Sequence, residues 1–225
     1  ARGLSFRHAV ELLRADHYPI AAQGSVQPVK RSTVRALPAP VEGDADDRKL
    51  LSHVVDYYHE TFKGSLEAQS YLQHRGLMSS EMVERFRIGF ANRTLGYRLP
   101  EKHRAAGERM RGSLTRIGIL RESGHEHFNG SIVIPIFGVK EGSGLTHYDL
   151  VQGIYGRKIT RGLRPGTPLH LYLPGSHKGV FNEAAVAAST EVILCEAIID
   201  ALTFWCAGYR NVTSSYGING FTDDH

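Results

Sequence analysis

The sequence predicts an α+β fold that continues into an α/β unit. Apolar residues recur at helical spacing between Arg48 and Phe86, which indicates a group of amphipathic helices. Two apolar stretches, Phe128–Phe137 and Leu150–Lys158, flank a glycine-rich loop and predict a pair of strands. Residues 191–217 have the pattern of a strand, a helix and a second strand. We therefore expect helices and a small sheet first, followed by a β-α-β unit.

Length and composition limit the class of protein. The chain has 225 residues, of which 41% are hydrophobic, so it can bury the core of one large or two small domains. Lys and Arg outnumber Asp and Glu by 27 to 23, which is a small excess. The two cysteines have neither disulfide nor metal-ligand spacing, and no apolar stretch reaches membrane-spanning length. These features predict a globular, cytoplasmic protein without a membrane partner.

The first 47 residues carry little signal for a packed domain. Residues 4–14 have the apolar pattern of a short amphipathic helix. Residues 19–47 are rich in proline and small polar residues and have no apolar period. Such a segment buries too little apolar surface to offset the loss of chain entropy. We therefore predict a linker at 19–47.

Three helices are predicted after this linker. The first covers residues 48–61, the second runs from Ser65 and is ended by Gly76, and the third begins at the capping residue Ser79. A small set of apolar residues is expected to pack these helices against the small sheet, namely Phe86, Ile88 and Phe90.

Two stretches before the strands carry clusters of ionisable residues. Residues 97–115 form a basic run, for which a solvated helix face and a nucleic-acid contact are both open interpretations. His125 and His127 bracket Glu126, but without a third ligand nearby we expect an exposed turn there and not a metal site. The cations of the run are Arg98, Lys102, Arg104, Arg109 and Arg111.

Two acids interrupt the apolar pattern of the predicted β-α-β unit. Glu196 falls at the end of the strand Val192–Cys195, which we expect to be buried, and Asp200 falls in the first turn of the next helix. Their carboxylates would then converge at the carboxyl edge of a parallel sheet, where open α/β sheets bind ligands. Such oxygen ligands suit Mg²⁺, which binds one or two carboxylates together with substrate phosphates. The alternative is that both acids are only favoured by the helix dipole.

The same stretch resembles the first half of a TOPRIM module. That module, found in bacterial DnaG-type primases and in topoisomerases, has an apolar strand, Glu-Gly-x-x-Asp, a helix, and a strand that closes on Ser-x-Gly. The chain carries Glu196 and Asp200 at the positions of the two acids, and Ser215 to Gly217 at the closing turn. Ala197 stands where the family has its glycine.

Upstream segments resemble other parts of the primase catalytic core, in the order in which that core has them. Residues 71–91 are similar to its opening segment. Residues 154–157 stand where the family has Gly-Phe-Gly-Gly-Arg, and there Gly156 would allow close backbone approach while Arg157 offers its guanidinium to a phosphate. The triplet His177-Lys178-Gly179 matches a family motif. The resemblance implies that nucleotide or nucleic acid binds at Arg157, Lys158, His177 and Lys178.

Other positions depart from the family pattern. Where the family has a lysine ahead of the tyrosine, this chain has Leu171 or His170, depending on the alignment. The residues after Gly179 are Val-Phe-Asn where the family has Leu-Tyr-Gly. These departures indicate a divergent branch, of the kind carried by a phage or another mobile element.

The resemblance implies a nucleotidyltransferase. We expect the catalytic core of a DNA primase, which makes short RNA primers on single-stranded DNA from ribonucleoside triphosphates with Mg²⁺ or Mn²⁺ and works beside a replicative helicase. Glu196 and Asp200 would be its catalytic acids and metal ligands. Residues 1–18 would be the tail helix of a zinc-ribbon domain, so zinc is expected only upstream of this chain. Residues 48–185 would form the basic N-terminal catalytic subdomain, and residues 186–225 a partial TOPRIM subdomain.

The family's second acidic pair, Asp-x-Asp on a later strand, has no counterpart in these 225 residues. We therefore expect an incomplete metal site and a fragment that is inactive alone. Asp223-Asp224-His225 is expected to begin a helix instead. Two alternatives remain open, namely a nuclease or topoisomerase-like TOPRIM enzyme and a non-catalytic nucleic-acid-binding domain of a replication protein.

Overall fold

A computed structural model describes residues 47–138, 151–218 and 220–225. The predicted helix at 4–14, the linker before Asp47 and the glycine loop at 142–144 lie outside these residues. Within the described ranges, none of the helices combines the length and the apolar character that crossing a membrane requires.

The three predicted helices are confirmed. Helix α2 covers Asp47–Lys63, α3 covers Leu66–His74 and α4 covers Ser80–Arg85. Each of the last two begins at a serine whose hydroxyl accepts a backbone N–H of the first turn: Ser65 Oγ from Ala68 and Ser79 Oγ from Met82, both at 3.3 Å.

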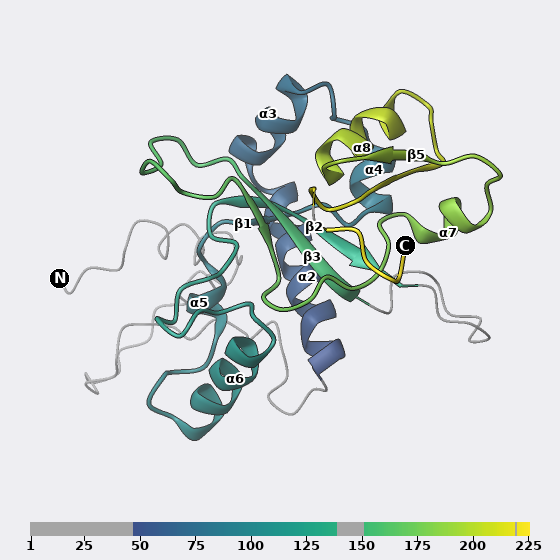
Figure 1. Ribbon diagram of the computed structural model, residues 1–225. Helices are drawn as coiled ribbons and strands as arrows, with labels where there is room; N and C mark the ends of the chain where they lie inside the picture. The colour runs from purple at the N-terminus through teal and green to yellow at the C-terminus, as the bar shows by residue number, and fades with distance from the viewer. Residues whose placement is uncertain (1–46, 139–150, 219) are drawn as a thin grey trace, which may run out of the picture.

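Four antiparallel strands form the main sheet, in the order β1-β2-β3-β4. They cover Gly89–Ala91, Ser131–Phe137, Val151–Lys158 and His170–Tyr172. Helix α2 packs against β1 so closely that a Cβ at Gly89 would lie 2.7 Å from Cβ of Tyr58. Figure 1 shows α2 crossing this sheet on one face.

The connection from β1 to β2 carries α5 (Leu95–Arg98) and α6 (Ala105–Arg116). It is fastened to the core by Glu126, which is buried and accepts 3.0 Å hydrogen bonds from the Tyr58 hydroxyl and the Leu95 backbone N–H. Burial, with the Glu126 charge beside it, raises the pKa of Tyr58. The prediction of an exposed turn was therefore wrong for Glu126. Its partners lie far away in the sequence, so no local pattern could indicate that it is buried.

The β-α-β unit is also confirmed. It consists of β5 (Ile193–Cys195), α8 (Ile198–Cys206) and β6 (Val212–Ser214), and its two strands are parallel. The short helix α7 (Glu183–Ala187) precedes it. The strand was expected to be buried, yet Val192 and Leu194 are 43% and 54% exposed. This exposure is confined to the β5 side, because all three residues of β6 are buried.

One hydrophobic core joins the β-α-β unit to the main sheet. The Phe86 ring lies 4.8 Å from the Phe181 ring and 5.3 Å from the Trp205 ring. Phe86, Ile88 and Phe90 are all buried in this core, as the sequence predicted. Helix α4 therefore holds the β-α-β unit in place beside the sheet (Figure 1).

Candidate functional site

Glu196 and Asp200 lie where the sequence placed them. Glu196 directly follows β5, and Asp200 lies in the first turn of α8. Both residues are exposed, and within the described part of the chain neither carboxylate has a hydrogen bond or an ion pair. The backbone of Glu196 is fixed, because its carbonyl accepts the Gly217 N–H at 2.8 Å and the Ser214 hydroxyl at 3.0 Å. The end of β6 thus holds Glu196 in position while its carboxylate stays free.

A hydrogen-bonded network on the main sheet centres on Arg157 of β3. Its Nε donates to the Tyr71 hydroxyl of α3 at 3.2 Å. Its Nη1 contacts Nε2 of His170, which lies opposite Arg157 on β4. The other ring nitrogen of His170 lies 2.9 Å from the Tyr155 hydroxyl. The guanidinium is therefore held from both a helix and a neighbouring strand.

Electrostatics link this network to the two carboxylates. Burial and the Arg157 charge lower the pKa of His170, while the charges of Asp200 and Glu196 act in the opposite direction. Burial also raises the pKa of Tyr155, and Asp200 contributes to this rise. Both acids of the β-α-β unit are therefore within electrostatic reach of the Arg157 network. Arg157 and Glu196 are 39 positions apart in the chain, so this link depends on the fold.

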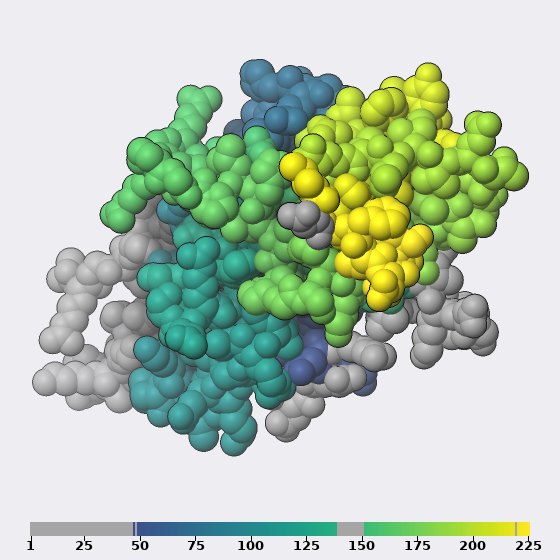
Figure 2. All heavy atoms as spheres, in the orientation of Figure 1, coloured from purple at the N-terminus to yellow at the C-terminus, as the bar shows by residue number. Residues whose placement is uncertain are grey.

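His177, Lys178 and Gly179 form a turn that the C-terminal residues hold in place. The Gly179 N–H donates to an Asp224 carboxylate oxygen at 2.7 Å, and its carbonyl accepts the Tyr216 hydroxyl at 2.9 Å. Figure 2 shows the yellow C-terminal residues lying against this green part of the surface. Lys178 is exposed beside them. Residues 223 and 224 lie in a turn, and the Asp224 carboxylate caps the Gly179 backbone. The expected helix start at 223–225 stays a prediction.

His177 itself is packed among aromatic rings. Its imidazole lies 4.5 Å from the Tyr172 ring and 5.7 Å from the Tyr216 ring, centroid to centroid. Burial lowers its pKa, with a further contribution from His225. A half-buried, neutral imidazole in this position serves to shape the turn that carries Lys178.

Lys158 and Arg157 are adjacent on β3, so their side chains point to opposite faces of the sheet. Its ammonium donates to the Asn129 carbonyl at 2.5 Å, and its pKa is lowered by burial and by the charges of Arg121 and Arg93. Arg93 Nε also donates to the Asn129 side chain. We call Arg93, Arg121 and Lys158 the basic cluster. The sequence analysis missed its two arginines, because no motif surrounds them and only the fold brings them to Lys158.

Gly156 has a packing role in the core that was not expected from the sequence. It is buried, and a Cβ at this position would lie 2.4 Å from Cδ1 of Phe128. The missing side chain therefore makes room for the Phe128 ring in the core. The expectation that Gly156 lets the backbone approach a phosphate stays a prediction.

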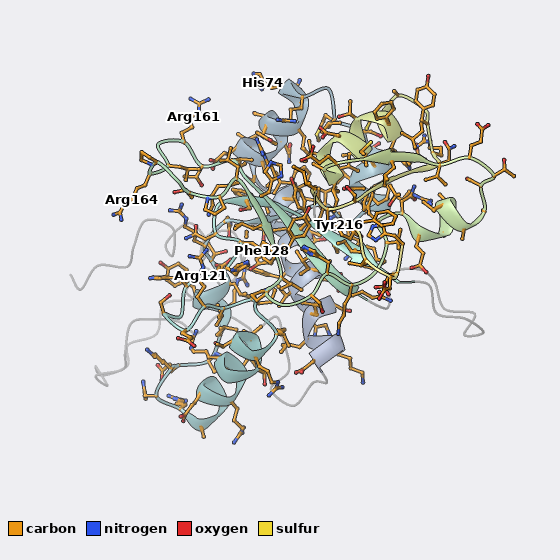
Figure 3. The ribbon with its side chains drawn as sticks, in the orientation of Figure 1. His74, Arg121, Phe128, Arg161, Arg164 and Tyr216 are labelled. Atoms are coloured by element: carbon orange, nitrogen blue, oxygen red, sulfur yellow. The ribbon has the colours of Figure 1, made fainter. Side chains whose placement is uncertain are left out.

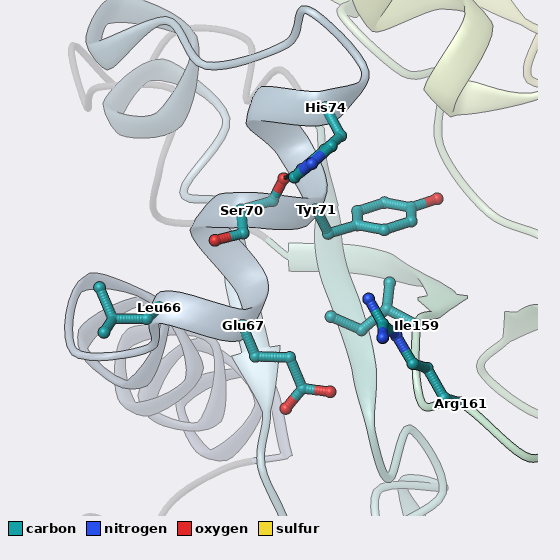
Figure 4. Close-up of a pocket in the computed structure, with 7 residues that line it drawn as sticks. All are labelled: Leu66, Glu67, Ser70, Tyr71, His74, Ile159 and Arg161. Atoms are coloured by element: carbon teal, nitrogen blue, oxygen red, sulfur yellow. Dashed lines mark hydrogen bonds between the residues drawn. The ribbon is translucent and has the colours of Figure 1, made fainter.

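A pocket of about 510 Å³ lies on the outer side of Tyr71. Figure 4 shows that α3 provides Glu67 and Tyr71 to its wall, while Arg161 reaches in from the segment after β3. Tyr71 therefore borders this pocket and also accepts the hydrogen bond from Arg157. Further cations extend from the same edge of the molecule in Figure 3, namely Arg121, Arg161 and Arg164.

Several cations of the basic run at 97–115 contact neighbouring residues of the same segment or of α2. Arg104 forms an ion pair with Glu101 at 2.8 Å, and Arg98 lies over the Tyr57 ring. Arg111 donates to the carbonyls of residues 96 and 100 at 3.3 and 3.2 Å, and burial lowers its pKa. These contacts favour the interpretation of the run as a helix face with structural roles.

The donor set at Glu196 and Asp200 fits a divalent cation that completes its shell from a substrate. In the part of the chain that the structure describes, no three His, Cys, Asp or Glu side chains are grouped as metal ligands. The two carboxylates are exposed, hard oxygen donors without competing partners. Mg²⁺ commonly binds through one or two such groups together with phosphate and water oxygens.

Comparison with known proteins points to one family of enzymes. No family model matches the chain. A DNA primase of Campylobacter jejuni is 24% identical over 200 residues, which cover 82% of this chain and 30% of that protein. The Escherichia coli primase catalytic core has a TM-score of 0.57 and 24% identity, over 79% of this chain and 56% of that structure.

Two further solved structures agree. A DnaG primase catalytic domain bound to single-stranded DNA has a TM-score of 0.57 and 23% identity, over 80% of this chain and 59% of its own. A DNA primase domain from Pseudomonas aeruginosa has a TM-score of 0.58 and 19% identity, over 76% of this chain and 54% of its own.

The chain therefore has an α+β fold of helices around a small antiparallel sheet. More narrowly, this fold is that of the catalytic core of DnaG-type DNA primases, which confirms the resemblance seen in the motifs. The chain spans 30% of the curated relative and a little over half of the solved catalytic cores.

Proposed function

We propose that this chain is part of the catalytic core of a DNA primase, an enzyme that makes short RNA primers on a single-stranded DNA template. The proposal rests on two unpaired, exposed carboxylates, Glu196 and Asp200, at the junction of β5 and α8, and on the hydrogen-bonded guanidinium of Arg157 on β3. Phosphoryl transfer needs this combination of an anionic metal site and fixed cationic donors. The primase core fold around it supports the same reaction class.

Glu196 and Asp200 would hold Mg²⁺ or Mn²⁺. When bound, the ion neutralises charge on the triphosphate and lowers the pKa of the attacking hydroxyl. Arg157 would bind a phosphate through its Nη2 donors, since Nε and Nη1 already contact Tyr71 and His170. Lys178, exposed on its fixed turn, would neutralise a second phosphate.

The template would bind on the basic side of residues 48–185, the segment that we interpret as the N-terminal catalytic subdomain. The basic cluster of Arg93, Arg121 and Lys158 provides cations beyond the carboxylate site. Neutralised DNA phosphates release counterions, which makes such binding strongly dependent on salt. Residues 186–225 would then be the part of a TOPRIM subdomain that supplies the acids.

Metal binding to this chain provides the test. Mn²⁺ broadens NMR signals of nearby amides even when it binds weakly, so titration should broaden amides around Glu196, Asp200 and Gly217. Glu196→Gln removes the charge but keeps the size, and should abolish this local broadening. Glu191→Gln is the matched control, because Glu191 is an exposed acid at the opposite end of β5. Equal broadening in the wild type and in Glu196→Gln would contradict the proposed metal site.

The functional alternatives are separated with a longer chain that also carries the second acidic pair, since these 225 residues are expected to be inactive alone. Incubation with ribonucleoside triphosphates, Mg²⁺ and a single-stranded template identifies a primase by ribonucleotide incorporation. Metal-dependent cleavage of the DNA would instead identify a nuclease that uses the same acids. DNA binding without any metal binding would favour a non-catalytic domain.

A further inference from the structure

We propose that His170 is a positioning residue, whose neutral imidazole accepts a hydrogen bond from Arg157 and fixes the guanidinium for phosphate binding. Its functional consequence rests on the proposed function of Arg157. The contact itself joins side chains on neighbouring strands, since Arg157 and His170 are directly opposite in the β3–β4 register. Residues opposite each other in antiparallel strands point to the same face of the sheet.

Two contacts determine the orientation of the guanidinium. Tyr71, on α3, accepts from Nε at 3.2 Å, and His170, on β4, contacts Nη1. A planar group held at two of its nitrogens keeps little freedom to rotate. The Nη2 donors are left for a ligand, because arginine carries five N–H donors in one fixed fork. Loss of the His170 contact would leave the fork attached only through Nε.

The geometry requires a particular form of the imidazole. Arginine only donates hydrogen bonds, so Nε2 of His170 must present its lone pair to Arg157. The proton of the neutral ring then lies on Nδ1, which faces the Tyr155 oxygen at 2.9 Å. Protonation of Nε2 would place two donors and two positive charges against each other. The tautomer is therefore a direct consequence of the positioning role.

The surroundings of His170 favour this neutral form. Burial lowers its pKa, as do the charges of Arg157 on β3 and Arg75 on α3. Asp200 and Glu196, from the β-α-β unit, raise the pKa of His170. Each of these two carboxylates has a smaller effect than Arg157. At neutral pH the imidazole is thus an acceptor. His170 is only partly buried, at the surface of the sheet, so its removal opens little cavity in the core.

A double-mutant cycle tests the coupling. The probe is a ribonucleoside triphosphate with Mg²⁺, and its affinity for the chain is measured by calorimetry. Arg157→Ala should weaken binding by about 10-fold and His170→Ala by about 3- to 5-fold, as expected for lost hydrogen bonds to a charged group. In the Arg157→Ala background, His170→Ala should cost nothing further. His170→Gln should restore part of the affinity, because its side-chain carbonyl can accept from Nη1.

A control and two outcomes make the cycle decisive. His103→Ala is the matched control, because the His103 side chain is 79% exposed and pairs only with Glu101 in the described structure. Equal losses from His170→Ala in both backgrounds would overturn the positioning role. An unchanged affinity in His170→Ala, together with a loss in Arg157→Ala, would overturn it as well.

A second measurement needs no ligand. Nitrogen-15 NMR of the imidazole should show, at neutral pH, His170 as a neutral ring with its proton on Nδ1 and a bare Nε2. A proton on Nε2 would overturn the inference whatever the binding data show. If the wild-type chain binds no nucleotide but has the Nδ1–H tautomer, the proposed function fails and the arginine–histidine contact stands.

Discussion

The main sheet and the β-α-β unit differ in how much of their surface is used for packing. Strand β2 is buried along almost its whole length, and the residues around it form both hydrophobic cores. Strand β5 has one buried residue, Cys195, while Leu194 is 54% exposed. The sheet therefore provides most of the stability, and the smaller unit presents the acids at its edge. The main sheet can therefore hold Arg157 in a fixed position, while the carboxylates of Glu196 and Asp200 stay unpaired in the described part of the chain.

Phe128 gives the sharpest test of where the stability resides. Its side chain is fully buried and lies against Gly156 of β3. Phe128→Ala should lower the free energy of unfolding by about 3–5 kcal/mol, because it removes buried apolar area and leaves a cavity. Urea denaturation measures this change. Phe221→Ala is the control, since Phe221 is 60% exposed, and should cost far less. Equal losses in the two variants would contradict this assignment of the core.

Much of this fold follows from local signals in the sequence. Serine caps and apolar periods predicted α3 and α4, and the pattern of residues 191–217 predicted β5, α8 and β6. The face of β5 was predicted less well. A run of apolar residues shows that a strand forms, but it does not show whether a second layer covers both faces.

The candidate site was predictable only where motifs surround it. Glu196 and Arg157 were found because they stand at strand ends in recognisable contexts, and Asp200 because it lies in the first turn of the helix that follows. Glu126 was missed because its two partners lie 31 and 68 positions away. His170 was noticed only as a departure from the family pattern, since its contact with Arg157 depends on strand pairing. The period of two in a strand already predicts that Lys158 and Arg157 point to opposite faces, but the sequence analysis grouped them in one site.

Arg157 and Lys158 should contribute to DNA binding independently. Each alanine variant should weaken binding of a single-stranded oligonucleotide and reduce the salt slope by about one for each lost phosphate contact. Because the two side chains point to opposite faces of β3, their losses should add in the double variant. Arg157→Lys should recover only part of the affinity, since lysine lacks the planar fork. Fluorescence anisotropy at several salt concentrations measures these effects.

Two outcomes would change this interpretation. Unchanged affinity and salt slope in both alanine variants would contradict the assignment of these cations to nucleic-acid binding. A double variant no worse than either single one would show that Arg157 and Lys158 act at one shared contact. In that case the basic cluster and the Arg157 network would form a single binding surface.

The smallest effect is expected at the exposed side of β5. Leu194 and Leu202 belong to the same unit, but Leu194 is 54% exposed on β5 and Leu202 is fully buried on α8. Leu202→Ala should cost about 2–5 kcal/mol of unfolding free energy, as deletion of buried methyl groups does. Leu194→Ala should stay within about 0.5 kcal/mol, as substitutions at exposed positions usually do. The pair keeps the chemical change constant, so the difference measures burial alone. A loss near that of Leu202→Ala would contradict this exposure, and would require that this side of β5 is covered when the protein is in solution.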